Sequence, residues 1–375
     1  MKIAHFIIAT SIISLTVFLL MPMSAYPWLD IKVEGSVSEI YDDNTTFTEE
    51  NEKSDSITNL TLSLAVKYEG KTQTLKFIGH INQQVFAENH GFNNTSQDFN
   101  LIFSSELSKY DRISLENVFT HTYEPRSFEE AFGRTGGRYS YYRNRFNFNY
   151  TKDISKQFSL ITKYGNEINE ISREDLKDSY LNKVGFEVDY FTSFATLLLF
   201  SYGFANRKFE YSKDASIQTM AIGIRPYISK RVYFDGKIGV DFINSYNDKG
   251  YSKPLILASL TDEISRNTRA GLSFAKQYNT DAYTEDIFNY WQTSAFFKRE
   301  LLKRLRYSLS GFYGEGEYVS LDIIDKLWGA NIALTYDFRE KLRGNLGYTY
   351  SDLDSTDVTR EYIKNTVFLS LTVEF

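Results

Sequence analysis

Residues 365–375 read NTVFLSLTVEF and alternate between apolar and mostly polar side chains. Successive residues of a β-strand point to opposite faces, so the pattern predicts a strand with one apolar face and one polar face that is interrupted by Phe368. The chain then ends on the aromatic Phe375, whereas the termini of soluble domains are usually loose and polar. A closed barrel with lipid outside and water inside accounts for both features.

The overall composition supports a membrane barrel. Charged residues make up 24% of the 375-residue chain, yet 16% of the residues are aromatic, with 28 Tyr and 30 Phe. A polar chain rich in Tyr and Phe is typical of a barrel whose apolar lipid face alternates with a polar lumen face. The formal net charge of −6 argues against nucleic acid as a partner.

The N-terminus has the features of an export signal. Lys2 precedes an apolar run over residues 6–20, and the small residues Ser24 and Ala25 offer a cleavage site. The run is shorter than the roughly 20 residues that span a bilayer, which disfavours a membrane anchor. We therefore expect a signal peptide over residues 1–25 and one barrel domain over residues 26–375. The chain has no Cys, so neither lipid attachment nor a disulfide is expected.

The connections between the alternating segments predict the topology. A long polar connection over residues 45–55 is followed by a tight one at residues 69–71, and this alternation of long and short continues down the chain. Long loops on one side and short turns on the other are typical of outer-membrane barrels. The sequence thus predicts an all-β fold, a transmembrane antiparallel β-barrel of about eighteen strands, with sixteen as the alternative count. Residues 253–260 alternate weakly and contain Pro254, which indicates a strand end.

One long loop, residues 124–138, reads EPRSFEEAFGRTGGR. Ser127 with Glu130 three residues later predicts a helix N-cap, and Gly133 follows residues 128–132 as a C-cap. The loop either folds inward and narrows the pore or lies at the surface with solvated charges. The charged residues of the loop and of the strand that follows are the candidate pore constriction: Arg126, Glu129, Glu130, Arg134, Arg138, Arg143 and Arg145.

The sequence offers little for catalysis or metal binding. The His residues beyond the signal, His80, His90 and His121, are far apart, and without Cys a metal site is not expected. Thr120 and Thr122 flank His121 and point to the opposite face of a strand, so no catalytic set can be named. We expect neither an enzyme nor a bound cofactor.

Two short motifs carry a family resemblance. Residues 41–44 read YDDN after a first alternating strand, and the chain closes with the aromatic strand quoted above. With these features the chain resembles the β-barrel porin 2 family, outer-membrane proteins of Gram-negative bacteria that often accompany exopolysaccharide export systems. The last strand also resembles the C-terminal assembly signal of outer-membrane barrels, carried here by Leu369, Leu371, Val373 and Phe375.

The resemblance implies a location and partners. It places the protein in the bacterial outer membrane after signal cleavage, in contact with membrane lipid and lipopolysaccharide, with the barrel assembly machinery, and with exopolysaccharide export components. We expect a porin-like passive channel for hydrophilic solutes or glycan. The alternative is a non-conducting barrel that serves as a structural scaffold of a surface or export complex.

Overall fold

A computed structural model describes residues 28–134, 137–192, 196–210, 214–226, 228–229, 231–244, 250–280 and 286–375. The expected signal segment, residues 1–25, lies outside the described residues. No helix among the described residues is long and apolar enough to cross a membrane.

The described residues form β-strands almost throughout. The strands are β1 (Trp28–Asp42), β2 (Asp55–Glu69), β3 (Gln73–Phe86), β4 (Asn94–Glu106), β5 (Asp111–Thr122), β6 (Tyr141–Asp153), β7 (Phe158–Ile171), β8 (Ser179–Phe191), β9 (Thr196–Phe209), β10 (Ala215–Pro226), β11 (Val232–Asn244), β12 (Tyr251–Ser265), β13 (Thr268–Thr280), β14 (Ile287–Leu302), β15 (Leu305–Tyr318), β16 (Ile323–Arg339), β17 (Leu342–Ser355) and β18 (Tyr362–Glu374). Short helical turns interrupt them at η1 (His90–Phe92), α2 (Phe128–Ala131) and η2 (Val358–Arg360).

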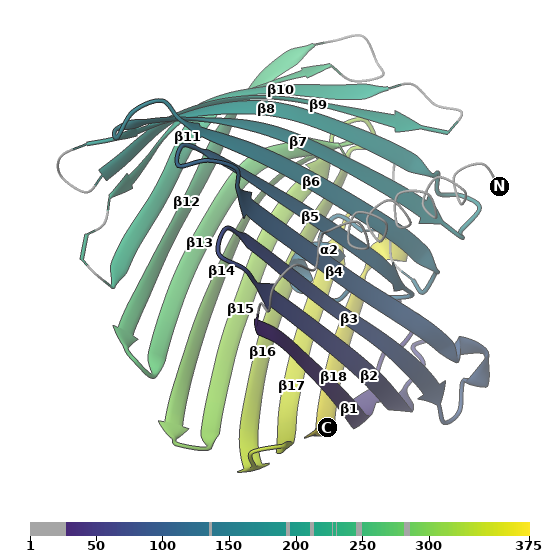
Figure 1. The fold of residues 1–375 in the computed structure, drawn as a ribbon. Coiled ribbons are helices and arrows are strands. Elements are labelled where there is room, and N and C mark those ends of the chain that lie inside the picture. Colours follow the sequence, from purple (N-terminus) through teal and green to yellow (C-terminus); the bar gives the residue numbers. More distant parts are fainter. Residues whose placement is uncertain are drawn as a thin grey trace.

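The strands close into one antiparallel barrel (Figure 1). Each strand pairs with its neighbours in the sequence, and β1 pairs with both β2 and β18. The 18-stranded sheet confirms the predicted architecture and the predicted strand count. Closure gives every strand a hydrogen-bonded neighbour on both sides, so no strand exposes a whole edge of unpaired backbone groups.

Side chains on the two faces of the wall differ as the alternation predicts. Leu369 and Leu371 of the last strand are 62% and 47% exposed on the outside, and Phe200 of β9 is 50% exposed. Inside, Ser370 accepts a hydrogen bond from Asn345 of β17 at 3.0 Å, and Phe368 packs over Gly347. An outer surface this apolar suits lipid rather than water.

The YDDN motif holds the first and last strands together. Asp42 forms an ion pair with Lys364 of β18 at 2.6 Å, and both side chains are buried. Asp43 accepts hydrogen bonds from the backbone N–H and the side-chain amide of Asn365 at 2.6 and 2.7 Å. Asn44 donates to the carbonyl of residue 363 at 2.9 Å. The motif therefore closes the barrel at the end that carries the long loops.

Candidate functional site

The segment between β5 and β6 crosses the inside of the barrel. Arg126 forms an ion pair with Asp98 of β4, whereas Phe128 and Phe132 contact β14, β15 and β16. In the strand order of the ring, β4–β6 and β14–β16 lie on opposite sides. A segment that touches both walls must pass through the lumen, and Figure 1 shows α2 inside the ring of strands.

Local sequence explains why the segment forms a helical turn. The Ser127 side chain accepts a hydrogen bond from the Glu130 backbone N–H at 3.2 Å, which confirms the predicted N-cap. The Glu130 carboxylate in turn accepts from the backbone N–H of Arg126 at 3.0 Å, one residue before the position used in a capping box. Gly133 follows the turn with a φ of +83°, a conformation that favours glycine.

Aromatic side chains anchor α2 to the strands β14–β16, which we call the far wall. Phe132 is only 8% exposed and packs edge-on against Phe288 and Phe312, with ring centroids 5.1 and 5.6 Å apart. Phe128 lies 6.2 Å from the Phe312 ring. These residues belong to a buried apolar cluster inside the barrel, at lumen positions where polar residues are usual.

Glycines of the far wall make room for these rings. A Cβ atom at Gly329 would lie 2.5 Å from the ring of Phe128, and one at Gly314 would lie 2.8 Å from the ring of Phe132. Real Cβ atoms do not approach so closely, so the docked position of α2 depends on these glycines.

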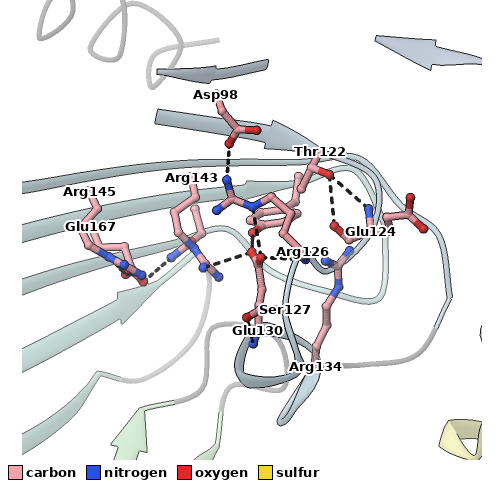
Figure 2. A network of polar contacts seen from close by, with 12 residues as sticks. Asp98, Thr122, Glu124, Arg126, Ser127, Glu130, Arg134, Arg143, Arg145 and Glu167 are labelled. Carbon is pink, nitrogen blue, oxygen red and sulfur yellow. Dashed lines mark hydrogen bonds and ion pairs between the residues drawn. The ribbon is translucent and has the colours of Figure 1, made fainter. Parts of the chain in front are cut away.

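Charged side chains hold α2 to the strands β4–β6, which we call the near wall (Figure 2). Glu130 forms ion pairs with Arg126 at 3.2 Å and with Arg143 of β6 at 3.5 Å, and it accepts a hydrogen bond from the Tyr141 hydroxyl. Arg126 also pairs with Asp98. The turn is therefore fixed by ion pairs on one side and by aromatic packing on the other.

A second charged cluster continues from Arg143 along the wall. Glu167 of β7 forms ion pairs with Arg145 of β6 at 3.1 Å and with Arg207 of β9 at 3.0 Å. Lys183 of β8 projects beside them, and within the described part of the chain it forms no ion pair. These four residues and Arg143 form a charged stripe on the lumen face of β6–β9.

Cavities lie on both sides of α2. One of about 240 Å³ is bounded by Glu129, Glu130 and Phe132 on the loop side and by the charged stripe on the wall side. A second of about 570 Å³ lies between α2 and the walls of β14–β18 and β1. Glu129 borders both cavities, and within the described chain it forms no ion pair. The turn thus separates two cavities of the lumen.

The base of the loop is held at the rim of the barrel that carries the long loops. Arg138 forms an ion pair with Glu124 at 3.1 Å, and Lys364 lies 3.8 Å from the same carboxylate. Burial tends to raise the pKa of Glu124, but the positive charges of Arg138 and Lys364 outweigh it and hold the pKa below its usual value. Arg134 donates to the Tyr139 hydroxyl at 2.9 Å and is buried.

The seven candidate constriction residues lie in two places: five are at the lumen constriction and two are at the base of the loop. Arg126, Glu130 and Arg143 meet at the near wall, Arg145 lies beside them, and Glu129 faces the two cavities. Arg134 and Arg138 lie at the base of the loop instead.

Sequence reasoning missed Asp98, Glu167, Lys183 and Arg207 as parts of this site. They lie on the lumen face of their strands, but their partners come from other strands, which alternation within one strand does not reveal. Phe312, an apolar side chain at a lumen position, was the available signal that something packs against the wall from inside.

The other predicted groups lie away from the lumen constriction. His121 stacks on Tyr142 with ring centroids 4.1 Å apart, and its ring bonds with the Ser140 hydroxyl at 3.1 Å. Phe375 donates its backbone N–H to the carbonyl of Val33 at 2.9 Å and is 73% exposed. Among the described residues no cluster of metal-ligating side chains occurs.

Neither a family model nor a curated protein matches this chain. Among solved structures, Pseudomonas aeruginosa OccK2 (OpdF) matches over 92% of this chain and 98% of its own, with 9% identity and a TM-score of 0.51. Acinetobacter baumannii OccAB4 also matches over 92% of this chain and 98% of its own, with 9% identity and a TM-score of 0.49. The siderophore receptor PirA from Pseudomonas aeruginosa matches over 94% of this chain and 81% of its own, with 9% identity and a TM-score of 0.45.

At such low identity the match to OccK2 shows a shared fold. The closed ring of eighteen antiparallel strands, with an apolar outside and a polar inside, defines the class as a porin-like β-barrel. No family model supports the finer assignment to the β-barrel porin 2 family.

Proposed function

We propose that this protein is an outer-membrane, porin-like channel for small hydrophilic solutes, with its constriction at α2 and a preference for anions. The observation that carries the proposal is the turn that crosses the lumen between a charged wall and an aromatic wall, with cavities on both sides. A barrel that served only as a scaffold would need no such fixed partition.

The lipid-facing surface supports a membrane location. Large apolar side chains such as Leu62, Ile222 and Ile238 are more than half exposed on the outside of the ring. Ion pairs such as Lys163–Glu187, at 3.1 Å, face the inside. Lipid outside and water inside satisfy both sets of side chains.

The charge around the smaller cavity supports an anion preference. Its lining contains the cations Arg143, Arg145, Lys183 and Arg207 and the carboxylates Glu129, Glu130 and Glu167. The cations exceed the carboxylates by one, and the field of this excess is focused by the low-dielectric walls of a narrow passage. Salt screens the effect, so the preference is strongest at low ionic strength.

Planar bilayer recordings test this proposal. Purified protein should conduct, and a KCl gradient should give a reversal potential that favours chloride, more so in dilute salt. Lys183→Gln should shift this potential toward potassium, whereas Lys152→Gln, on the exposed periplasmic end of β6, should leave it unchanged. Deleting residues 127–134 should raise the conductance. Absence of conductance under all conditions would favour the scaffold alternative.

We further propose that the channel takes part in exopolysaccharide export, which the sequence resemblance alone supports. The expected partners are export components, lipopolysaccharide and the barrel assembly machinery. Co-purification from outer membranes, with a barrel of unrelated sequence as control, tests each of these contacts. Recovery of the same proteins with both barrels would remove the export link.

A further inference from the structure

The barrel wall is split at one junction. Pairing between β12 and β13 runs from the short turn only as far as Ile256 opposite Lys276. Beyond this rung, residues 251–255 of β12 pair only with β11, and residues 277–280 of β13 pair only with β14. Within the described strands, this is the longest unpaired stretch at the extracellular end of the barrel. We call it the β12–β13 seam.

The wall overlaps itself at the seam. By strand alternation Tyr278 shares the outer face of β13 with Lys276, yet it is only 8% exposed. It belongs to a buried cluster with Ile217 of β10 and Ile243 of β11, which oppose each other on the lumen face, and with Ile287 of β14. The ends of β13 and β14 therefore lie beneath the lumen face of β10 and β11.

Side-chain contacts, rather than a backbone ladder, close the seam. Besides the apolar cluster, the Arg207 guanidinium donates to the Thr280 hydroxyl at 3.0 Å. Pro254 lacks a backbone N–H, and Lys253 precedes it, both of which discourage a further strand from adding to the free edge of β12. A seam of this kind is able to part without breaking backbone hydrogen bonds.

A cavity of about 610 Å³ lies directly behind the seam. On the seam side it is bordered by Leu255, Leu257 and Tyr278. Its charged lining contains the Lys163–Glu187 ion pair and Lys183, which forms no ion pair within the described part of the chain. The cavity thus offers an apolar side next to the seam and a lining of mixed charge in which Lys183, without an ion pair, is available to an anion. This arrangement suits a solute with an apolar tail and an anionic head.

A cation also marks the outer mouth of the seam. Lys276 lies on the lipid-facing side of the last paired rung, opposite Ile256 and next to Trp291 of β14. A lysine near the membrane boundary reaches the headgroup region with its ammonium group while its stem stays in the apolar layer. There it is placed to meet the head of an anionic amphiphile inserted in the outer leaflet.

We propose that the β12–β13 seam is a lateral portal through which amphipathic anions pass between the lumen cavity and the outer leaflet of the membrane. This route is separate from the axial channel proposed above, since it is closed by Tyr278 rather than by α2. Its test therefore uses solutes that share a head and differ in the tail.

The experiment compares uptake of decanesulfonate and ethanesulfonate by proteoliposomes. Because the chain has no native Cys, a disulfide between Ile243→Cys and Tyr278→Cys would lock the seam selectively. The matched control pair is Ile238→Cys with Ile256→Cys, which are already opposed in the β11–β12 ladder. The seam disulfide should abolish decanesulfonate uptake until reductant is added, and ethanesulfonate uptake should persist. Equal effects on both solutes, or on neither, would overturn the portal.

Single substitutions keep the proposal testable if the disulfide does not form. Tyr278→Ala should raise decanesulfonate uptake relative to ethanesulfonate, because it removes the ring that seals the seam. Lys276→Gln should lower that ratio, whereas Lys208→Gln, a cation at the extracellular end of β9, should not. An unchanged ratio in both the Tyr278 and Lys276 variants rules out the portal. Loss of ethanesulfonate uptake alone would instead contradict the axial channel.

Discussion

Phe132→Ala should release α2 from the far wall and open the constriction. Phe132 is the residue of the turn that packs most deeply, against Phe288, Tyr290 and Phe312. The contacts that remain after the substitution are the ion pairs on the near wall. The turn should then stay attached to β6 and move away from β14–β16.

The size of the effect follows from the burial of the ring. Truncation of a buried Phe to Ala costs about 3–5 kcal/mol, through lost transfer free energy and the cavity left behind. About 3 kcal/mol changes an equilibrium roughly a hundredfold. The equilibrium constant between docked and undocked α2 should therefore fall about a hundredfold, and the undocked, open state should become well populated.

Single-channel recording measures this change directly. The expected result is a higher mean conductance with frequent transitions between levels. Phe204→Ala is the matched control, because Phe204 has the same side chain but is 37% exposed on the lipid face of β9. Gly329→Val should also release α2 from the far wall, because the added Cβ would displace the Phe128 ring. If Phe132→Ala folds and its conductance and noise equal those of the parent protein, α2 does not limit the pore.

Three further predictions test the wall, the closing strand and the loop base. Phe200→Arg should cost about 2–4 kcal/mol if the site lies near the bilayer midplane, whereas its lumen-facing neighbour Ser201→Arg, opposite Glu187, should be tolerated; urea unfolding in detergent that reverses this order would refute the assignment of faces. Deletion of Phe375 removes the proposed assembly signal and should leave the protein in the periplasm or degraded, and normal outer-membrane levels on cell fractionation would contradict this. The lowered pKa of Glu124 means that its ion pairs contribute fully above the ordinary Glu value of about 4.3 and are lost as pH falls through the folded value, so channel noise should rise only under acid conditions. Glu124→Gln should be noisy at neutral pH and insensitive to acid, and a parent-like response in this variant would remove Glu124 as the anchor.

Local periodicity was sufficient to predict most of the fold. The side-chain period of a strand is fixed by backbone geometry, so alternation gave the strand faces, and loop lengths gave the hairpin order and the count of eighteen. The cap of α2 was also readable, because Ser127 and Glu130 interact within one turn. These features depend on residues that are close in the sequence.

Tertiary structure alone decided where the charges and rings meet. Glu167 and Arg207 pair across two strand junctions, and Phe132 meets Phe288 only because the ring brings the far wall opposite the loop. Alternation would have assigned Tyr278 to lipid, but the overlap at the β12–β13 seam buries it against Ile243. Such contacts depend on curvature and closure of the whole sheet, which no local pattern encodes, because a strand's period fixes the face of each side chain but not what lies opposite that face.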